Sequence, residues 1–345
     1  MVSPQPIINH KYFQLRKNTY PKGIKSLFYL SWEDALWDLM NKKDIKKGSY
    51  ILVPDFYCDD VEKNIKLHRY KVGYYKINKD LTVNKKSFQS CIKLLKPQVV
   101  VIFHAVGIKN NLLENTKWLS KITNDSILIE DSVHRTIDPK EIKIFKKNHF
   151  IIDSLRKVVP IQGSRIFGNS EDLDFDLPSI FQSMPYAMGV NILWLLMVVS
   201  WTLSLKRLAE KLMLFGYDLI GNSGLSARGS ILGSFLSERL NVSKIQKYKL
   251  NQVRFYEKKL RGVLPHKLNI SEEDKKHLRG YPVVLSKENS ARVMKILRNN
   301  GLLVRFELDG SEWSKYRKII FLPLGPYLNI NNLTDVCSLV IESMK

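Results

Sequence analysis

Short apolar runs that alternate with helical segments constrain the fold of this 345-residue chain most strongly. The runs at 50–54, 99–104 and 126–130 are dominated by valine, isoleucine and leucine, and segments with helical periodicity lie between them. Near-continuous apolar runs are typical of parallel strands that are buried on both faces of a sheet. The pattern therefore predicts an α/β domain whose mostly parallel sheet is flanked by helices.

Chemically useful side chains follow the ends of these predicted strands. His104 and Asp131 end two of them, and Lys157 comes shortly after a third apolar run. In parallel sheets, ligands bind beyond the carboxyl ends of the strands. An acid and a lysine placed there suit pyridoxal phosphate (PLP), because the lysine can form a Schiff base and the carboxylate can keep the pyridinium nitrogen protonated. The plain alternatives are a surface lysine and a helix-capping aspartate.

The formal net charge of +22 is spread along the whole chain and favours anionic partners. Nucleotide-linked substrates, acidic membrane surfaces and nucleic acid all qualify. Since the sequence has neither zinc-finger spacing nor an RNA-binding signature, we expect no nucleic-acid partner and no metal. Its three cysteines lie far apart and its N-terminus has no apolar signal segment, so we expect a cytoplasmic protein.

Residues 187–205 complicate this expectation, because they form an uncharged stretch of nineteen residues that is long enough to span a bilayer. The plain interpretation is a buried or half-buried helix, including one at a subunit contact. A transmembrane helix and a helix lying in the membrane plane are the alternatives. A peripheral contact with the inner surface of the membrane therefore stays open.

The sequence divides into three parts. Residues 1–25 contain three prolines and are expected to form an N-terminal arm. Residues 26–238 are expected to form the large α/β domain. Residues 239–345 begin with a long charged helix and are expected to form a small C-terminal α+β domain.

Five segments, in this order, resemble the DegT/StrS-type (DegT/DnrJ/EryC/StrS) sugar aminotransferases, a branch of the fold-type-I PLP enzymes. FHAVG resembles the family's H-x-x-G turn, IEDSVH its i-E-D-c-a-H strand end, and SLRKVVPIQG its S-l-R-K-x-L-P segment. The five segments are 47–58, 103–107, 129–134, 154–163 and 321–325. The resemblance implies a seven-stranded, mostly parallel sheet, a small C-terminal domain and a homodimer with its site at the subunit boundary.

The resemblance also assigns roles to single residues. Lys157 would be the catalytic lysine that binds PLP and moves a proton between the amino donor and the cofactor. Asp131 would pair with the pyridinium nitrogen, and His134 would donate to the ring's O3′ unless it is merely structural. The other expected cofactor contacts are Ser154, Ser31 and Trp32 around the phosphate and Tyr57 or Cys58 near the ring face. Arg165 is a further candidate for the phosphate, from a spacing seen in the wider aminotransferase group, although the sugar-aminotransferase branch normally has a small residue there.

The turn that begins at Ser31 departs from the family pattern. Ser31 can be a plain helix cap or a phosphate ligand, since both roles need the same geometry. Trp32 replaces a glycine that allows close backbone approach, and Glu33 and Asp34 bring negative charge toward the phosphate. The turn therefore puts the affinity for the cofactor in question.

The expected function is an aminotransferase that moves an amino group from a glutamate-like donor to a nucleotide-linked keto-sugar for polysaccharide synthesis. Arg156 and Arg228 are candidate contacts for the diphosphate. The alternative is an altered or inactive relative that acts as a binding or scaffold protein near the membrane. A PLP-dependent sugar dehydration is the third hypothesis, but in the family it goes with histidine in place of Lys157.

Overall fold

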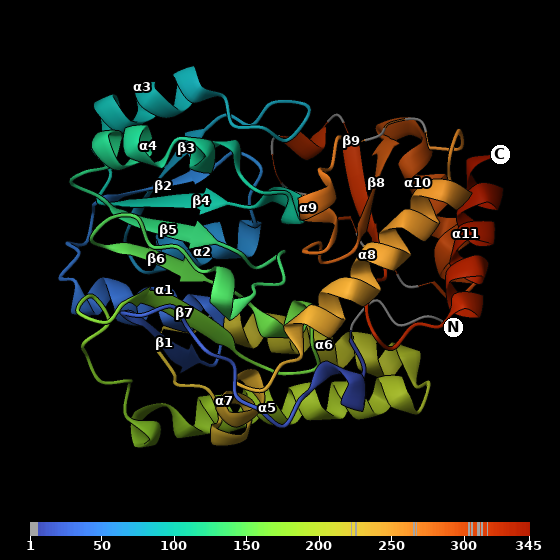
Figure 1. The fold of residues 1–345 in the computed structure, drawn as a ribbon, viewed down its shortest axis with the longest axis horizontal. Helices are drawn as coiled ribbons and strands as arrows, with labels where there is room; N and C mark the ends of the chain where they lie inside the picture. Colours follow the sequence, from blue (N-terminus) through green and yellow to red (C-terminus); the bar gives the residue numbers. More distant parts are fainter. Residues whose placement is uncertain are drawn as a thin grey trace.

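The computed structural model describes residues 6–345 except 222, 225, 265, 267, 303, 305, 309, 310, 312 and 316. In Figure 1 the large sheet and its flanking helices lie at the left of the molecule, and a smaller group of C-terminal elements lies at the right. The helices α5, α6 and α7 lie along a third face, below both groups.

Seven strands form the large sheet in the order β1-β7-β6-β5-β4-β2-β3. The run from β3 to β6 is parallel, whereas β7 pairs antiparallel with both β6 and β1. The strands are β1 Ile24–Tyr29, β2 Tyr50–Pro54, β3 Lys71–Tyr75, β4 Val99–Phe103, β5 Ile127–Asp131, β6 His149–Ile152 and β7 Ser164–Asn169. The predicted mostly parallel, seven-stranded sheet is confirmed.

Helices cover both faces of this sheet, as the apolar runs predicted. On β4, Val99 and Val101 pack in the hydrophobic cluster that includes α1 and α2. The alternate residues Val100 and Ile102 pack in the cluster that includes α3 and α4. The four helices are α1 Trp32–Lys42, α2 Asp59–Leu67, α3 Lys85–Leu95 and α4 Thr116–Ile122. Burial on both faces explains why this strand has no polar alternation.

The C-terminal elements have a hydrophobic cluster of their own, which runs from Val253 to Val340. Two antiparallel strands, β8 and β9, lie among its helices. The elements are α8 Val242–Lys259, α9 Glu272–Lys275, β8 Tyr281–Ser286, α10 Lys287–Asn299, β9 Arg317–Leu322 and α11 Ile330–Met344. A separate cluster agrees with a second unit, although the expected boundary at 239 stays a prediction.

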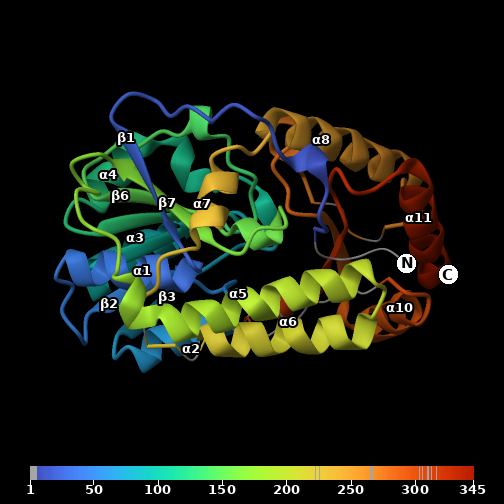
Figure 2. The same ribbon diagram turned by 90° about the horizontal axis from the view of Figure 1, so that it is seen from below.

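The uncharged stretch at 187–205 lies in a helical hairpin on the outside of the molecule. The hairpin consists of α5 Ile180–Thr202 and α6 Lys206–Gly221, and α7 Ile231–Ser237 lies beside it in Figure 2. By length and composition 183–202 could cross a membrane, and 28% of its most apolar window is buried. One side of α5 is an exposed apolar stripe made of Phe181, Met184, Met188, Ile192, Leu195, Leu196 and Val199.

Candidate active site

A cavity of about 370 Å³ lies beyond the carboxyl ends of β4, β5 and β6. Four parts of the chain line it: the strand ends of the large sheet, the first turns of α1 and α2, the helix α6, and the C-terminal elements. A smaller cavity of about 60 Å³ shares Lys157, Met213, Arg279 and Glu307 with it. The predicted site residues in the lining of the larger cavity are Trp32, Tyr57, Asp131, His134, Ser154 and Lys157.

Lys157 ends a single 3-10 turn, Leu155–Lys157, which begins after the two residues that follow β6. The Leu155 N–H donates to the Gly163 carbonyl oxygen at 2.9 Å, which closes the loop after the lysine. Gly163 has φ +149°, and a Cβ there would collide with the ring of Phe28. Packing and backbone geometry thus fix the turn, and they leave the half-buried lysine in the lining of both cavities.

Asp131 ends β5 and is 2% exposed. The Tyr57 hydroxyl donates to its Oδ2 at 2.7 Å, and the Val133 N–H donates to its Oδ1 at 3.1 Å. Burial raises the pKa of Asp131 to about 6, although these hydrogen bonds and the charge of Lys157 oppose the rise. The carboxylate is therefore mostly ionised at pH 7, and a cationic ring nitrogen beside it would be stabilised.

His134 is held by the H-x-x-G turn. Gly107 has φ +92°, and a Cβ there would lie 2.5 Å from the His134 carbonyl oxygen, so only glycine fits. Burial, followed by the charges of Lys157 and Arg279, keeps the pKa of His134 well below its ordinary value, so the ring is neutral. Its buried Nδ1 has no hydrogen-bond partner among the described residues. A ligand oxygen in the cavity would satisfy this nitrogen.

The turn before α1 is occupied by contacts within the protein. The Ser31 side chain accepts from the Asp34 N–H at 3.1 Å, and its hydroxyl donates to the Asp34 carboxylate. Asp34 also accepts from the Ala227 N–H at 2.9 Å, and burial raises its pKa to about 8. Ser31 is thus a helix cap and does not belong to the cavity lining, whereas Trp32 and Glu33 do.

Arg165 lies on β7 and is 2% exposed. Its Nε and Nη2 donate to Asp153 Oδ2 at 2.9 and 2.7 Å, and its backbone N–H donates to Oδ1 at 2.7 Å. The Asp153 carboxylate thus neutralises this guanidinium away from the residues that line the cavity. A phosphate contact by Arg165 stays a prediction that this ion pair does not favour.

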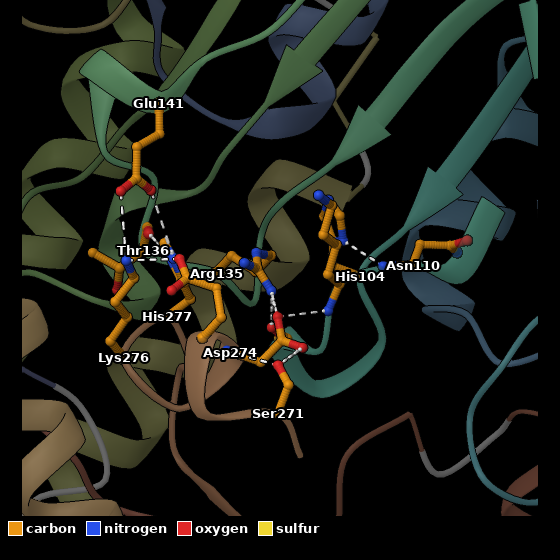
Figure 3. Close-up of polar contacts among 12 residues, drawn as sticks. His104, Asn110, Arg135, Thr136, Glu141, Ser271, Asp274, Lys276 and His277 are labelled. Carbon is orange, nitrogen blue, oxygen red and sulfur yellow. Dashed lines mark hydrogen bonds and ion pairs between the residues drawn. The ribbon is translucent and has the colours of Figure 1, made fainter. Parts of the chain in front are cut away.

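His104 lines a different cavity, of about 680 Å³, and has a structural role. Its Nε2 lies 2.8 Å from Glu130 Oε1, and its Nδ1 accepts from the Asn110 N–H at 3.0 Å. Nearby, Arg135 donates to both the Gly107 carbonyl oxygen and Asp274 Oδ1 at 2.6 Å (Figure 3). The network connects the H-x-x-G turn to α9. It therefore holds in place the turn that packs against His134.

Several lining residues carry no signal in the sequence. Arg279 and Glu307 come from the C-terminal elements and pair at 3.0 Å, and Arg279 Nη1 also lies 3.4 Å from His134 Nε2. Tyr217 and Met213 come from α6. Only the packing of the C-terminal elements and the hairpin against the sheet brings these residues to the cavity.

No protein-family model matches the chain, and no curated protein matches it in sequence. Solved structures do match its fold. Spr1654 from Streptococcus pneumoniae in its PLP form is 12% identical, with a TM-score of 0.64 over 99% of this chain and 98% of that one. A DegT DnrJ EryC1 StrS aminotransferase from Brucella abortus is 16% identical, with a TM-score of 0.59 over 92% of this chain and 86% of that one. Helicobacter pylori PseC, an aminotransferase involved in the biosynthesis of pseudoaminic acid, is 13% identical with the same TM-score and the same coverage of both chains.

The chain therefore has the fold of the DegT/DnrJ/EryC1/StrS-type aminotransferases. The fold implied by the resemblance in sequence is confirmed. Structures of Spr1654 exist in both PLP and PMP forms, so the same fold holds this cofactor elsewhere. In this chain the buried carboxylate of Asp131, the orphaned Nδ1 of His134 and the lysine of the lining fit that group.

Proposed function

We propose that this chain is a PLP-dependent aminotransferase of the DegT/StrS type. The observation that carries the proposal is the meeting of Asp131, His134 and Lys157 on one cavity in this fold. Bound PLP supplies an electron sink for charge that develops on the Cα of the amino donor. Lys157 lines both adjoining cavities, so its amine can reach ligands in either. Its role in the proposal is to hold the cofactor and to carry a proton to and from that Cα.

The other residues hold and orient the group. Asp131 pairs with the ring nitrogen, and the Tyr57 hydroxyl fixes the carboxylate in place. The neutral ring of His134 contacts the ring oxygen through its free Nδ1. An inactive scaffold is not favoured, since the buried carboxylate of Asp131 and the Nδ1 of His134, which has no described partner, are costly for folding unless a ligand contacts them.

The second substrate is proposed to be a nucleotide-linked keto-sugar, and the donor glutamate or a similar amino acid. The net charge of +22 supports a substrate with a diphosphate. Incubation of the PLP-loaded protein with glutamate is expected to shift its visible absorbance and release one 2-oxoglutarate per bound cofactor. Loading with PLP but no response to any of the common amino acids would contradict transamination.

A homodimer is proposed as the working form. On α7, exposed Ile231, Leu232 and Phe235 form an apolar surface. A Cβ on Gly233 of the same helix would lie 3.0 Å from the Phe28 ring, and that ring also packs on Gly163 of the lysine loop. A second copy on α7 would therefore press on the turn that carries the catalytic lysine.

We also propose that the exposed stripe of α5 contacts an anionic membrane surface. The segment 180–205 has no charge, and the strongly basic chain is attracted to anionic lipid. Leu195→Glu is expected to weaken binding to phosphatidylglycerol vesicles by about tenfold or more. Leu195 is 58% exposed on the stripe, and Leu94, which is 82% exposed on α3, provides the matched control Leu94→Glu.

Co-sedimentation with vesicles of phosphatidylglycerol and of phosphatidylcholine measures this effect. Binding to neither kind of vesicle, or equal binding by both variants, would contradict the membrane contact. Conversion of a dimer to a monomer by Leu195→Glu in light scattering would make the stripe a subunit interface instead.

A further inference from the structure

Arg156 lies immediately before the catalytic lysine and is 7% exposed. Its guanidinium stacks over the ring of Tyr217, 4.5 Å from the centroid. Its Nε is buried and has no hydrogen-bond partner among the described residues. None of the carboxylates in the described residues forms an ion pair with this guanidinium. Arg165, nearby in sequence, is 2% exposed but is paired with Asp153.

A buried arginine without a counter-ion is unusual, because the charge loses its hydration and gains nothing in return. The stacking on Tyr217 offsets only part of this loss. Arg156 lines the 370 Å³ cavity together with Ser154 and Lys157. The missing counter-ion can therefore come from a ligand in that cavity, and the ligand must be an anion.

We infer that Arg156 binds the phosphate group of the cofactor, an inference that rests on the proposed function. In PLP the phosphate arm and the aldehyde are attached to neighbouring carbons of the ring. An anion site beside Lys157 is therefore where the phosphate belongs once the aldehyde meets that lysine. A guanidinium suits the group, since its planar fork can donate two parallel hydrogen bonds to phosphate oxygens.

The turn before α1 explains why this chain needs such a residue. The Ser31 hydroxyl is engaged with Asp34, and the Glu33 side chain lines the cavity with a buried Oε2 that has no described partner. A carboxylate there repels a phosphate. Arg156 supplies the positive charge that this turn does not.

Pyridoxal, which lacks the phosphate, separates this role from a general effect on the site. Titrations of the wild-type protein and Arg156→Gln with PLP and with pyridoxal, followed by visible absorbance, give four dissociation constants. We expect Arg156→Gln to weaken PLP binding by about 10- to 100-fold and to leave pyridoxal binding unchanged. Arg156→Lys should restore part of the affinity for PLP.

Arg254→Gln is the control, since Arg254 is an exposed arginine of α8 that pairs with Glu272 at 3.0 Å and lies outside the cavity lining. It should bind both aldehydes like the wild type. Equal weakening of PLP and pyridoxal by Arg156→Gln would show a structural role and overturn the inference. Unchanged PLP binding with weaker binding of a nucleoside diphosphate would assign the arginine to the substrate's phosphates and also overturn it. A wild-type protein that binds neither aldehyde would overturn the proposed function as well.

Discussion

Replacing Lys157 with alanine should abolish transamination and leave the protein folded. The half-buried side chain makes no hydrogen bond among the described residues, so its loss should not disturb the turn that Gly163 and Phe28 fix. The loss of both the covalent link and the proton carrier should lower the rate by roughly 10⁴-fold or more. Release of 2-oxoglutarate measures the rate, and circular dichroism checks the fold.

Lys63 provides the control for this substitution. It also lines the larger cavity, but its side chain is 77% exposed and pairs with Asp60 at 3.6 Å. Lys63→Ala should keep nearly full activity. Substantial activity in Lys157→Ala, or a similar loss in both variants, would show that another group performs the chemistry.

Asp131→Asn should lower the rate by roughly 10²- to 10³-fold, because an amide cannot stabilise a cationic ring nitrogen as a buried carboxylate does. The amide oxygen can accept from the Val133 N–H, and the amide NH2 can donate to the Tyr57 hydroxyl, which also accepts, so the cavity should keep its shape. Single-turnover absorbance with glutamate measures the rate. A rate close to that of the wild type would exclude a role for this carboxylate at the ring nitrogen.

The same substitution should stabilise the cofactor-free protein. Burial raises the pKa of Asp131 from its ordinary value of 3.8 to about 6, so the folded state binds the proton more tightly than the unfolded state. Stability therefore falls as the pH rises from about 4 to 6, by roughly 3 kcal/mol in total. The gain in the free energy of unfolding of Asp131→Asn should be largest above pH 6 and should shrink toward pH 4. A gain that does not change with pH would contradict this origin.

The large sheet could be predicted from the sequence because its signals are local. The valine and isoleucine runs of β4 and β5 are buried on both sides, as their composition requires. The residues around Lys157 could be predicted because they follow strand ends, which lie together in any parallel sheet. His104 follows the same rule but serves the network behind the site, since its ring contacts Glu130 and Asn110.

The phosphate side of the site could not be predicted in this way. A serine before a helix has the same local sequence pattern whether it caps the helix or binds a phosphate. In the structure the Ser31 hydroxyl is engaged with Asp34, whose carboxylate is held by the N–H of the distant Ala227, so Ser31 is a cap. Arg165 matches a spacing of the wider aminotransferase group, yet Asp153 neutralises it. The importance of Arg156 lies in the absence of a carboxylate partner among the described residues, which only three-dimensional packing reveals.

Reduction of the PLP-loaded protein with borohydride, followed by peptide mapping, tests the central claim most directly. Borohydride converts a Schiff base to a stable amine and so marks the lysine that held the cofactor. The arrangement of Asp131, His134 and Lys157 predicts one cofactor per chain, attached to the peptide that contains Lys157. Absence of a bound cofactor, or its scatter over the many surface lysines, would contradict the assignment of this cavity as a PLP site.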